Sequence, residues 1–143
     1  VVRRFGRMFV TAASMSVPFF TVILRKGYGL GAQAMAGGSF MSPLFTITWP
    51  TGEFGGMGLE GAVKLGFRKE LEAIEDLDER NDKYLEMVAA SYERGKATNM
   101  ASFLEIDDAI DPKDTRRWIM SALKSAPKPH PREGKKRNHV DTW

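Results

Sequence analysis

Alternating glycines follow the first strongly apolar stretch of the chain, and they are the first feature that could support chemistry. Residues 19–24 are apolar and rich in β-branched side chains, which is typical of a buried strand. Gly27, Gly29 and Gly31 come next, and the residues after them favour a helix. A helix that opens after a glycine bend has backbone N–H groups without intrahelical partners, at the positive end of its dipole. Such amides suit a developing oxyanion or a phosphate.

Side chains offer weaker candidates for chemistry. Glu53 and Glu60 flank a second glycine cluster at 55–58 and could act as an acid–base pair, although a carboxylate at position 60 also suits the first turn of a helix. His130 and His139 lie near the C-terminus without metal-ligand spacing, and no serine stands in a G-x-S-x-G elbow. The glycines at 27–31 form neither a P-loop nor a dinucleotide fingerprint. The main chain is therefore the stronger candidate, and we expect no metal site.

Two strand–glycine–helix units are predicted to position these groups. The first comprises the strand at 19–24, the glycine bend and a helix that ends at Gly37 and Gly38. The second comprises an alternating strand at 44–49 and a helix at 59–71 that follows the second glycine cluster. Because strands and helices alternate, the pattern predicts an α/β layered domain and not a helix bundle.

The rest of the chain is predicted to be mainly helical. Apolar residues between 84 and 92 predict an amphipathic helix that ends before Gly95. The acidic residues between 70 and 79 are interpreted as a solvated surface, not as a cation site. Asp111 and Pro112 match an N-cap followed by proline at the first helical position. The helix that they start is expected to bury one side, made of Trp118, Ile119, Ala122 and Leu123.

Composition narrows the class of protein. The chain has 143 residues, of which 43% are hydrophobic, enough for one globular domain. It has no cysteine, which excludes disulfides, thiolate metal sites and a cysteine nucleophile. The net charge is only +3, and no apolar run reaches the ~20 residues of a membrane span. We therefore expect neither nucleic acid nor a membrane as a partner.

The chain is expected to comprise a domain at 1–124 and a tail at 125–143. Residues 1–13 carry a helical apolar stripe with no initiator methionine, no capping residue before it and no cleavage site. We therefore expect the chain to start inside an element, as an N-terminally truncated domain would. From residue 125 onward, prolines alternate with basic residues, which predicts an extended basic tail.

Four segments, in chain order, resemble one protein family. Residues 25–35 (RKGYGLGAQAM) resemble the R-K-x-Y-G-x-(G/A)-x-x-x-M segment of the carboxyltransferase β subunit of biotin-dependent acyl-CoA carboxylases of the propionyl-CoA carboxylase type. Residues 49–54 (WPTGEF), 57–63 (MGLEGAV) and 106–116 (IDDAIDPKDTR) are similar to the family's A-W-P-T-A-E, M-G-x-x-G-A-V and I-D-x-V-I-x-P-x-x-T-R segments. Four colinear motifs are far more specific than any glycine pattern alone.

The resemblance implies a fold and a set of site residues. The fold is ClpP/crotonase-like, built from ββα superhelical units, and residues 1–124 correspond to the C-terminal part of the second carboxyltransferase repeat. The backbone N–H groups of Leu30 and Gly31, supported by Gly29, are implied to form an oxyanion hole that faces the ureido oxygen of biotin. Gln33 takes the place of a side chain that discriminates between acyl chains. Replacing Gly31 by proline or a bulky residue is expected to be the most damaging single change.

The resemblance also implies an activity and partners. The activity is transfer of a carboxyl group from carboxybiotin to the α-carbon of a short acyl-CoA such as propionyl-CoA, without a side-chain base; Gln33 leaves acetyl-CoA and longer or branched chains open. No A-M-K-M biotinylation segment is present, so biotin is expected on a separate carrier and not covalently on this chain. The implied partners are a biotin carboxylase/biotin carrier subunit and further copies of the chain. The implied compartment is the cytoplasm in a bacterium or the mitochondrial matrix in a eukaryote.

Two other classes of function remain open at this point. A crotonase-type hydratase or isomerase would use a carboxylate pair such as Glu53 and Glu60. It would lose turnover on Glu53→Gln and would need no biotin. A non-catalytic fragment would only bind a biotin carrier or other subunits.

Overall fold

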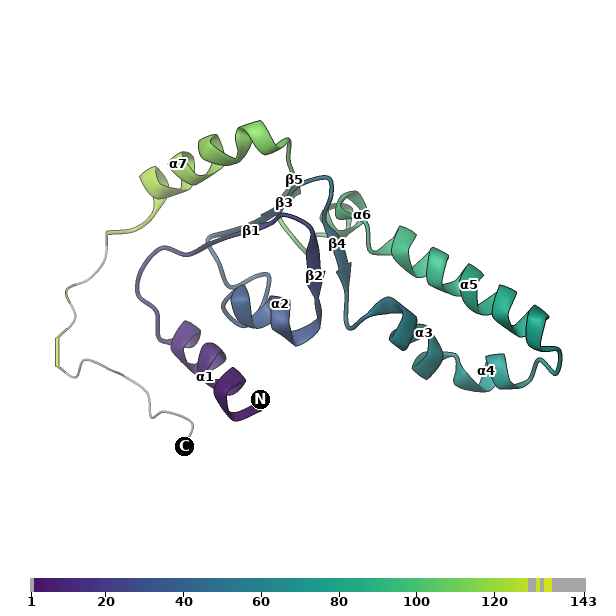
Figure 1. Ribbon diagram of the computed structural model, residues 1–143. Coiled ribbons are helices and arrows are strands. Elements are labelled where there is room, and N and C mark those ends of the chain that lie inside the picture. Colours follow the sequence, from purple (N-terminus) through teal and green to yellow (C-terminus); the bar gives the residue numbers. More distant parts are fainter. Residues whose placement is uncertain (1, 129–130, 132, 135–143) are drawn as a thin grey trace.

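The computed structural model describes residues 2–128, 131, 133 and 134 and shows a mixed α/β arrangement (Figure 1). Its elements, in chain order, are α1 (Val2–Ala13), β1 (Phe20–Ile23), β2 (Lys26–Tyr28), α2 (Gly29–Met35), β3 (Phe45–Thr48), β4 (Glu53–Gly55), α3 (Leu59–Gly66), α4 (Arg68–Glu72), α5 (Leu77–Arg94), α6 (Ala97–Ser102), β5 (Asp108–Ala109), η1 (Pro112–Asp114) and α7 (Thr115–Ser125). The predicted helix start at Asp111 is confirmed, because its carboxylate accepts a hydrogen bond from the backbone N–H of Lys113.

Two consecutive ββα units, β1-β2-α2 and β3-β4-α3, form the centre of the structure. Strand β1 pairs in parallel with β3, with Phe20 opposite Phe45. Strand β2 pairs in parallel with β4, with Lys26 opposite Glu53. Strand β5 adds to the first pair, so that this sheet has the order β1-β3-β5. The predicted α/β class is confirmed, and the ββα order is the one that the family resemblance implies.

The second strand of each unit differs from the expectation of a plain glycine loop. Residues 26–28 form β2, and residues 53–55 form β4. Each strand has only three residues and contains a glycine, which leaves little strand signal in the sequence. A Cβ at Gly27 would lie 3.3 Å from the ring of Phe54 in the paired strand. These short strands therefore form because the two units pair with each other. The residues of either strand alone do not predict this pairing.

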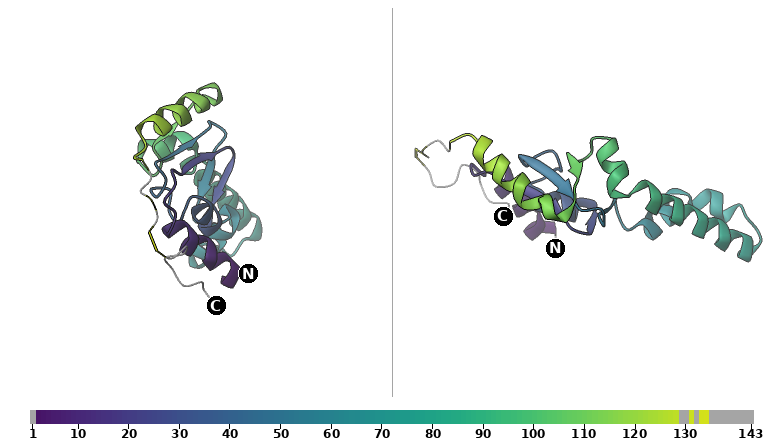
Figure 2. Two further views of the ribbon diagram at one scale, coloured as in Figure 1. Left: turned by 90° about the vertical axis from the view of Figure 1, so that its left-hand side faces the viewer. Right: turned by 90° about the horizontal axis from the view of Figure 1, so that it is seen from above.

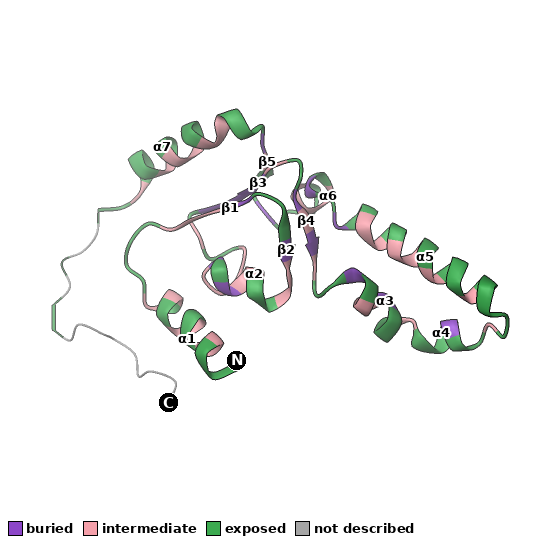
Figure 3. Cartoon of the chain, viewed as in Figure 1, coloured by how far each residue is buried: buried purple, intermediate pink, exposed green. Residues whose placement is uncertain are grey.

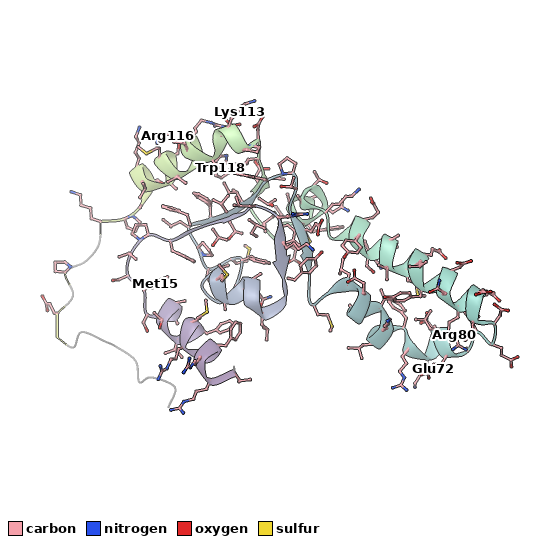
Figure 4. All side chains as sticks on the ribbon, viewed as in Figure 1. Met15, Glu72, Arg80, Lys113, Arg116 and Trp118 are labelled. Carbon is pink, nitrogen blue, oxygen red and sulfur yellow. The ribbon has the colours of Figure 1, made fainter. Side chains whose placement is uncertain are left out.

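Strand β3 is the central strand, and all four of its residues are buried (Figure 3). Burial of a parallel strand on both faces is usual when helices cover the sheet. On one face, Phe45, Ile47 and Ile110 form a cluster that α7 covers. Trp118 of α7 lies edge-on to the ring of Phe45, and it occupies the side of the helix that faces the sheet, whereas Lys113 and Arg116 lie on the outer side (Figure 4).

Helix α7 half-buries three of the four residues predicted for its inner side. Trp118, Ile119 and Ala122 pack against the cluster beneath it, but Leu123 is 48% exposed. Including Leu123 was therefore wrong, although it fits the same sequence spacing.

The second cluster lies between β1, β4 and α6. Ile23, Phe54, Ala97 and Ile106 are its buried members, and Phe40 and Met100 pack against them. The backbone N–H of Phe54 donates to the carbonyl of Gly95, and that of Ala97 donates to the carbonyl of Gly52. These contacts fix the end of α5 and the start of α6 against the second ββα unit.

Helices α3, α4 and α5 form an arm that extends away from the sheets (Figure 2). The helix predicted at 59–71 is interrupted at Phe67, which separates α3 from α4. The helix predicted to end before Gly95 is confirmed as α5, and the Asp76 carboxylate caps it through the N–H groups of Asp78 and Glu79. Within the described ranges, no helix has the length and hydrophobicity needed to cross a membrane.

Candidate oxyanion site at the strand-to-helix bend

The bend between β2 and α2 is formed by Tyr28 and Gly29. Tyr28 is extended, with φ −107° and ψ 135°, and it precedes the helix without capping it through its side chain. Gly29 has φ +59°, a conformation that costs an L-residue roughly 1–2 kcal/mol. Because the first N–H groups of a helix have no intrahelical acceptor, the amides that open α2 depend on groups outside the helix.

Leu30 and Gly31 carry the amides that the sequence resemblance singles out. Within the described part of the chain, neither a carbonyl outside the helix nor a side chain accepts a hydrogen bond from these two nitrogens. The Leu30 side chain is 65% exposed, and a Cβ at Gly31 would meet no atom within 4 Å. The two donors are thus left open to a ligand, and nothing described in this chain would clash with a side chain at position 31.

Parallel pairing brings a second helix start to the same edge of the structure. Strand β4 runs beside β2 and leads through Gly56 and Gly58 into α3, which begins at Leu59. The carbonyl oxygen of Gly56 would lie 3.0 Å from a Cβ at Gly29, so the two bends are in close contact. Two helix N-termini, each with its positive dipole end, therefore lie next to one another.

A pocket of about 250 Å³ lies beside the bend, between α2, the β2–β4 pair and α6. Its lining comprises Gly27, Gly29, Gln33, Phe40, Phe54, Gly55, Gly56, Met100 and Glu105. The glycines expose backbone to the cavity, the three large side chains make apolar walls, and Gln33 and Glu105 contribute polar groups. The structure thus brings Gly29 and Gln33 to one cavity, whereas Leu30 and Gly31 are not part of its lining.

Glu53, the first candidate carboxylate, is engaged by a tyrosine. The hydroxyl of Tyr28 donates to Glu53 Oε2 at 3.3 Å. Partial burial, reinforced by the negative charge of Glu53 and by this hydrogen bond, raises the pKa of Tyr28 to about 12. The phenol therefore stays protonated, as a hydrogen-bond donor, throughout the neutral range.

Glu60, the second candidate carboxylate, is engaged by a different tyrosine. The hydroxyl of Tyr92, on α5, donates to Glu60 Oε1 at 2.7 Å. The backbone N–H of Glu60 itself and this hydroxyl lower the pKa of Glu60, and the charge of Lys26 adds to the effect. Glu53 and Glu60 thus each accept a hydrogen bond from a different tyrosine, and the charges of both carboxylates act on Tyr28 and on Tyr92. Among the residues described, no group of three or more acidic or histidine side chains could hold a metal ion, and His130 and His139 lie outside those residues.

Sequence reasoning missed most of the pocket wall. Met100 and Glu105 come from segments far from the glycine bend in the chain, Phe40 lies in the loop after α2, and the spacing of the three carries no chemical signal. Tyr28 is different, because it lies within the motif that carries the family resemblance. A tyrosine placed directly before a helix-opening glycine was the available signal for its role at the bend.

The two paired ββα units are the arrangement expected of a ClpP/crotonase-like structure, and the amides that open α2 have no described acceptor outside the helix. Comparison with known families identifies the match as the carboxyl transferase domain, over residues 1–140. The chain belongs to this family. The interpretation drawn from the four sequence motifs is therefore confirmed at the level of the family.

Two relatives illustrate the similarity in sequence. The chain is 33% identical to the carboxyltransferase subunit of propionyl-CoA carboxylase from Haloferax mediterranei, over 87% of this chain and 23% of that protein. It is 35% identical to the 12S subunit of methylmalonyl-CoA carboxyltransferase from Propionibacterium freudenreichii, over 86% of this chain and 23% of that protein. The chain thus spans about a quarter of the length of these relatives.

Solved structures show the same fold. A single-chain, multi-domain long-chain acyl-CoA carboxylase shares 55% identity with a TM-score of 0.69, over 85% of this chain and 12% of that one. The transcarboxylase 12S hexamer, solved with methylmalonyl-coenzyme A and methylmalonic acid bound, shares 30% identity with a TM-score of 0.83, over 100% of this chain and 27% of that one. The crotonase-like architecture expected from the sequence is confirmed.

Proposed function

We propose that the chain contributes the biotin side of the carboxyltransferase active site in a biotin-dependent acyl-CoA carboxylase. The protein that contains it would move a carboxyl group from carboxybiotin to the α-carbon of an acyl-CoA. The observation that carries the proposal is the bend at Gly29, where α2 opens with uncapped amides in a chain of the carboxyl transferase family. The relatives named above act on propionyl-CoA, methylmalonyl-CoA or long-chain acyl-CoA.

The donor chemistry at the bend fits the ureido oxygen of biotin. When bound, biotin supplies a carboxyl carrier whose ureido oxygen gains negative charge as the carboxyl group leaves. The amides of Leu30 and Gly31 would hold that oxygen, and Gly29 would allow the main chain to turn toward it. Preorganised donors of this kind stabilise developing charge without a side-chain base. The known loss on removing one such donor is about 10²–10³ in rate.

Acyl specificity would be set in the pocket beside the bend. Gln33 lies in its wall with Phe40 and Met100, so that a polar and an apolar surface face the same cavity. A short acyl group such as propionyl is the expectation from the sequence motifs. The 55% identity to a long-chain acyl-CoA carboxylase favours a longer chain as the second candidate, and the substrate panel described below separates the two.

Partners and compartment follow from the proposed reaction. Biotin would arrive on a separate carrier, together with a biotin carboxylase subunit. We propose a homo-oligomeric assembly, in line with the hexamer described for the transcarboxylase 12S protein. The reaction would take place in the cytoplasm of a bacterium or in the mitochondrial matrix of a eukaryote.

The test is carboxyl transfer measured on the full-length protein. Decarboxylation of malonyl-CoA and methylmalonyl-CoA, with and without free biotin, should depend on biotin. Carboxylation of acetyl-, propionyl- and long-chain acyl-CoA should then define the substrate. Gly31→Pro removes one donor and should lower kcat by about 10²–10³, because the site loses a hydrogen bond to the developing charge.

Two variants control for side effects of the proline. Gly31→Ala and Leu30→Ala keep both amides, and neither position is packed against described residues, so we expect near wild-type rates. Biotin-independent hydration of an enoyl-CoA, with loss of turnover on Glu53→Gln, would contradict the proposal and favour a hydratase. A full-length protein that binds a biotin carrier but transfers no carboxyl group would favour the non-catalytic alternative.

A further inference from the structure

Strand β4 contacts the bend at Tyr28 and Gly29, which joins β2 to α2. Helix α2 opens without a side-chain cap, so its first turn has no local anchor. Three positions at and just after β4 contact the bend instead: Glu53, Gly55 and Gly56. They lie opposite β2 because the two strands pair in parallel, with Tyr28 opposite Gly55.

The Tyr28 side chain is the part of the bend that reaches across to β4. A Cβ at Gly55 would lie 3.0 Å from Cδ1 and Cε1 of the Tyr28 ring, so the ring rests directly on this glycine. Its hydroxyl then reaches Glu53 Oε2 at 3.3 Å, two residues back along the strand. Ring packing and the hydrogen bond together fix the orientation of the residue that immediately precedes Gly29.

We propose that Tyr28 is a positioning residue for the amides of Leu30 and Gly31, with Glu53 as its hydrogen-bond acceptor. This inference rests on the proposed carboxyltransferase function. Tyr28 holds the main chain where it turns into α2, and the direction of the next two N–H groups follows from that turn. The raised pKa of Tyr28 agrees with this role, because the phenol remains a donor and is unsuited to proton transfer at neutral pH.

The chain provides a matched control in a second tyrosine–glutamate bond. Tyr92 donates to Glu60 at 2.7 Å and joins α5 to α3. The pair lies near enough to Tyr28 for its charge to act on the pKa of that residue, but among the described residues neither side chain hydrogen-bonds to the α2 bend. Tyr92→Phe removes the same kind of bond as Tyr28→Phe. A general effect of losing one phenol–carboxylate bond would appear in both variants, whereas an effect on the amides would appear only in Tyr28→Phe.

The experiment compares kcat and KM in the full-length protein, using biotin-dependent decarboxylation of methylmalonyl-CoA. Tyr28→Phe should lower kcat about three- to tenfold, as expected for loss of one hydrogen bond, and leave KM for the acyl-CoA unchanged. Glu53→Ala should have the same effect. Glu53→Gln should recover most of the activity, because an amide oxygen also accepts from the phenol. The double variant Tyr28→Phe/Glu53→Ala should lose no more than either single variant.

The remaining outcomes separate failure of the proposed function from failure of the roles given to Tyr28 and Glu53. If the wild-type protein shows no biotin-dependent transfer, the proposed function fails, and this inference fails with it. If the wild type is active and Tyr28→Phe keeps its kcat, or loses no more than Tyr92→Phe, only the positioning role is wrong. Should Glu53→Gln be as damaging as Glu53→Ala, the carboxylate has a role other than accepting from Tyr28. A melting temperature for each variant shows that the rates refer to folded protein.

Discussion

Gly29 has a backbone conformation that favours glycine over every other residue. Its φ of +59° and the Gly56 carbonyl oxygen, 3.0 Å from a Cβ at this position, both oppose any side chain. We expect Gly29→Ala to lower the free energy of unfolding by about 1–2 kcal/mol from the conformation alone, and further if the Gly56 carbonyl does not move. Urea unfolding measures the change.

Gly31→Ala is the matched control for that measurement. Position 31 lies in the helix, and an added Cβ there meets no atom within 4 Å. Alanine is the better helix former by roughly 0.5–1 kcal/mol, so this variant should be neutral or slightly more stable. Equal destabilisation by the two substitutions would show that the bend does not impose the conformation described.

The titration of Tyr28 provides a second test at this scale. Partial burial and the nearby Glu53 raise its pKa from 10.0 to about 12, so the fold disfavours the phenolate. This contribution to stability is fully present below pH 10 and is lost as the pH rises to about 12. The tyrosinate absorbance of wild type minus that of Tyr28→Phe should therefore titrate near pH 12. A difference spectrum with a midpoint at the ordinary pKa of tyrosine would contradict the partner assignment.

The glycine bend before α2 could be predicted from sequence, but the side chains around it could not. Glycine before a helix indicates free amides because it is a local property, and the family motif places Leu30 and Gly31 in register. The pairing of Tyr28 with Glu53 depends on which strand lies beside β2. Met100 and Glu105 reach the pocket only through the packing of α6 and the segment after it. The spacing of residues in one sequence does not show which distant segments contact each other in the fold.

At the scale of elements, α7 is attached to the sheet chiefly through one aromatic residue. Trp118 packs edge-on against Phe45, with ring centroids 5.6 Å apart, and it contacts the cluster under the helix. Trp118→Ala should lower the free energy of unfolding by about 2–3 kcal/mol, somewhat less than the loss of a fully buried tryptophan. Hydrogen exchange of the amides in α7 should accelerate. Met120→Ala, on the exposed side of the same helix, should change either quantity little.

Long elements were predicted well and short ones poorly, for a physical reason. Helix α5 and the start of α7 carry caps and periodic apolar residues, which are local signals. Strands β2, β4 and β5 have two or three residues each and are held by pairing with distant strands. The break at Phe67 between α3 and α4 also escaped prediction, because the apolar pattern of 59–71 continues across it.

At the scale of the molecule, an apolar surface lies between α1 and α2. Met8, Met15 and Met35 line one hollow there of about 320 Å³, and Met35 is 73% exposed. Exposed apolar patches of this kind favour association. We expect the 143-residue chain alone to self-associate as its concentration rises, as measured by sedimentation velocity. The Met35→Lys substitution should shift the association equilibrium toward the monomer. A monomer at every concentration would mean that this surface does not drive contact between copies.

The parallel register of β2 and β4 places the proposed main-chain donors beside the neighbouring pocket and not in its lining. The proposed charge-stabilising groups belong to the peptide backbone, and the geometry of two abutting turns sets their direction. Residues such as Gln33, Phe40 and Met100, which line the neighbouring hollow, take no part in that geometry beyond their own packing. Under the proposed function, substrate preference would therefore change through side-chain replacement while the proposed donors stay intact. Attempts to redirect this scaffold to other thioesters should begin at those three positions and leave both turns unaltered.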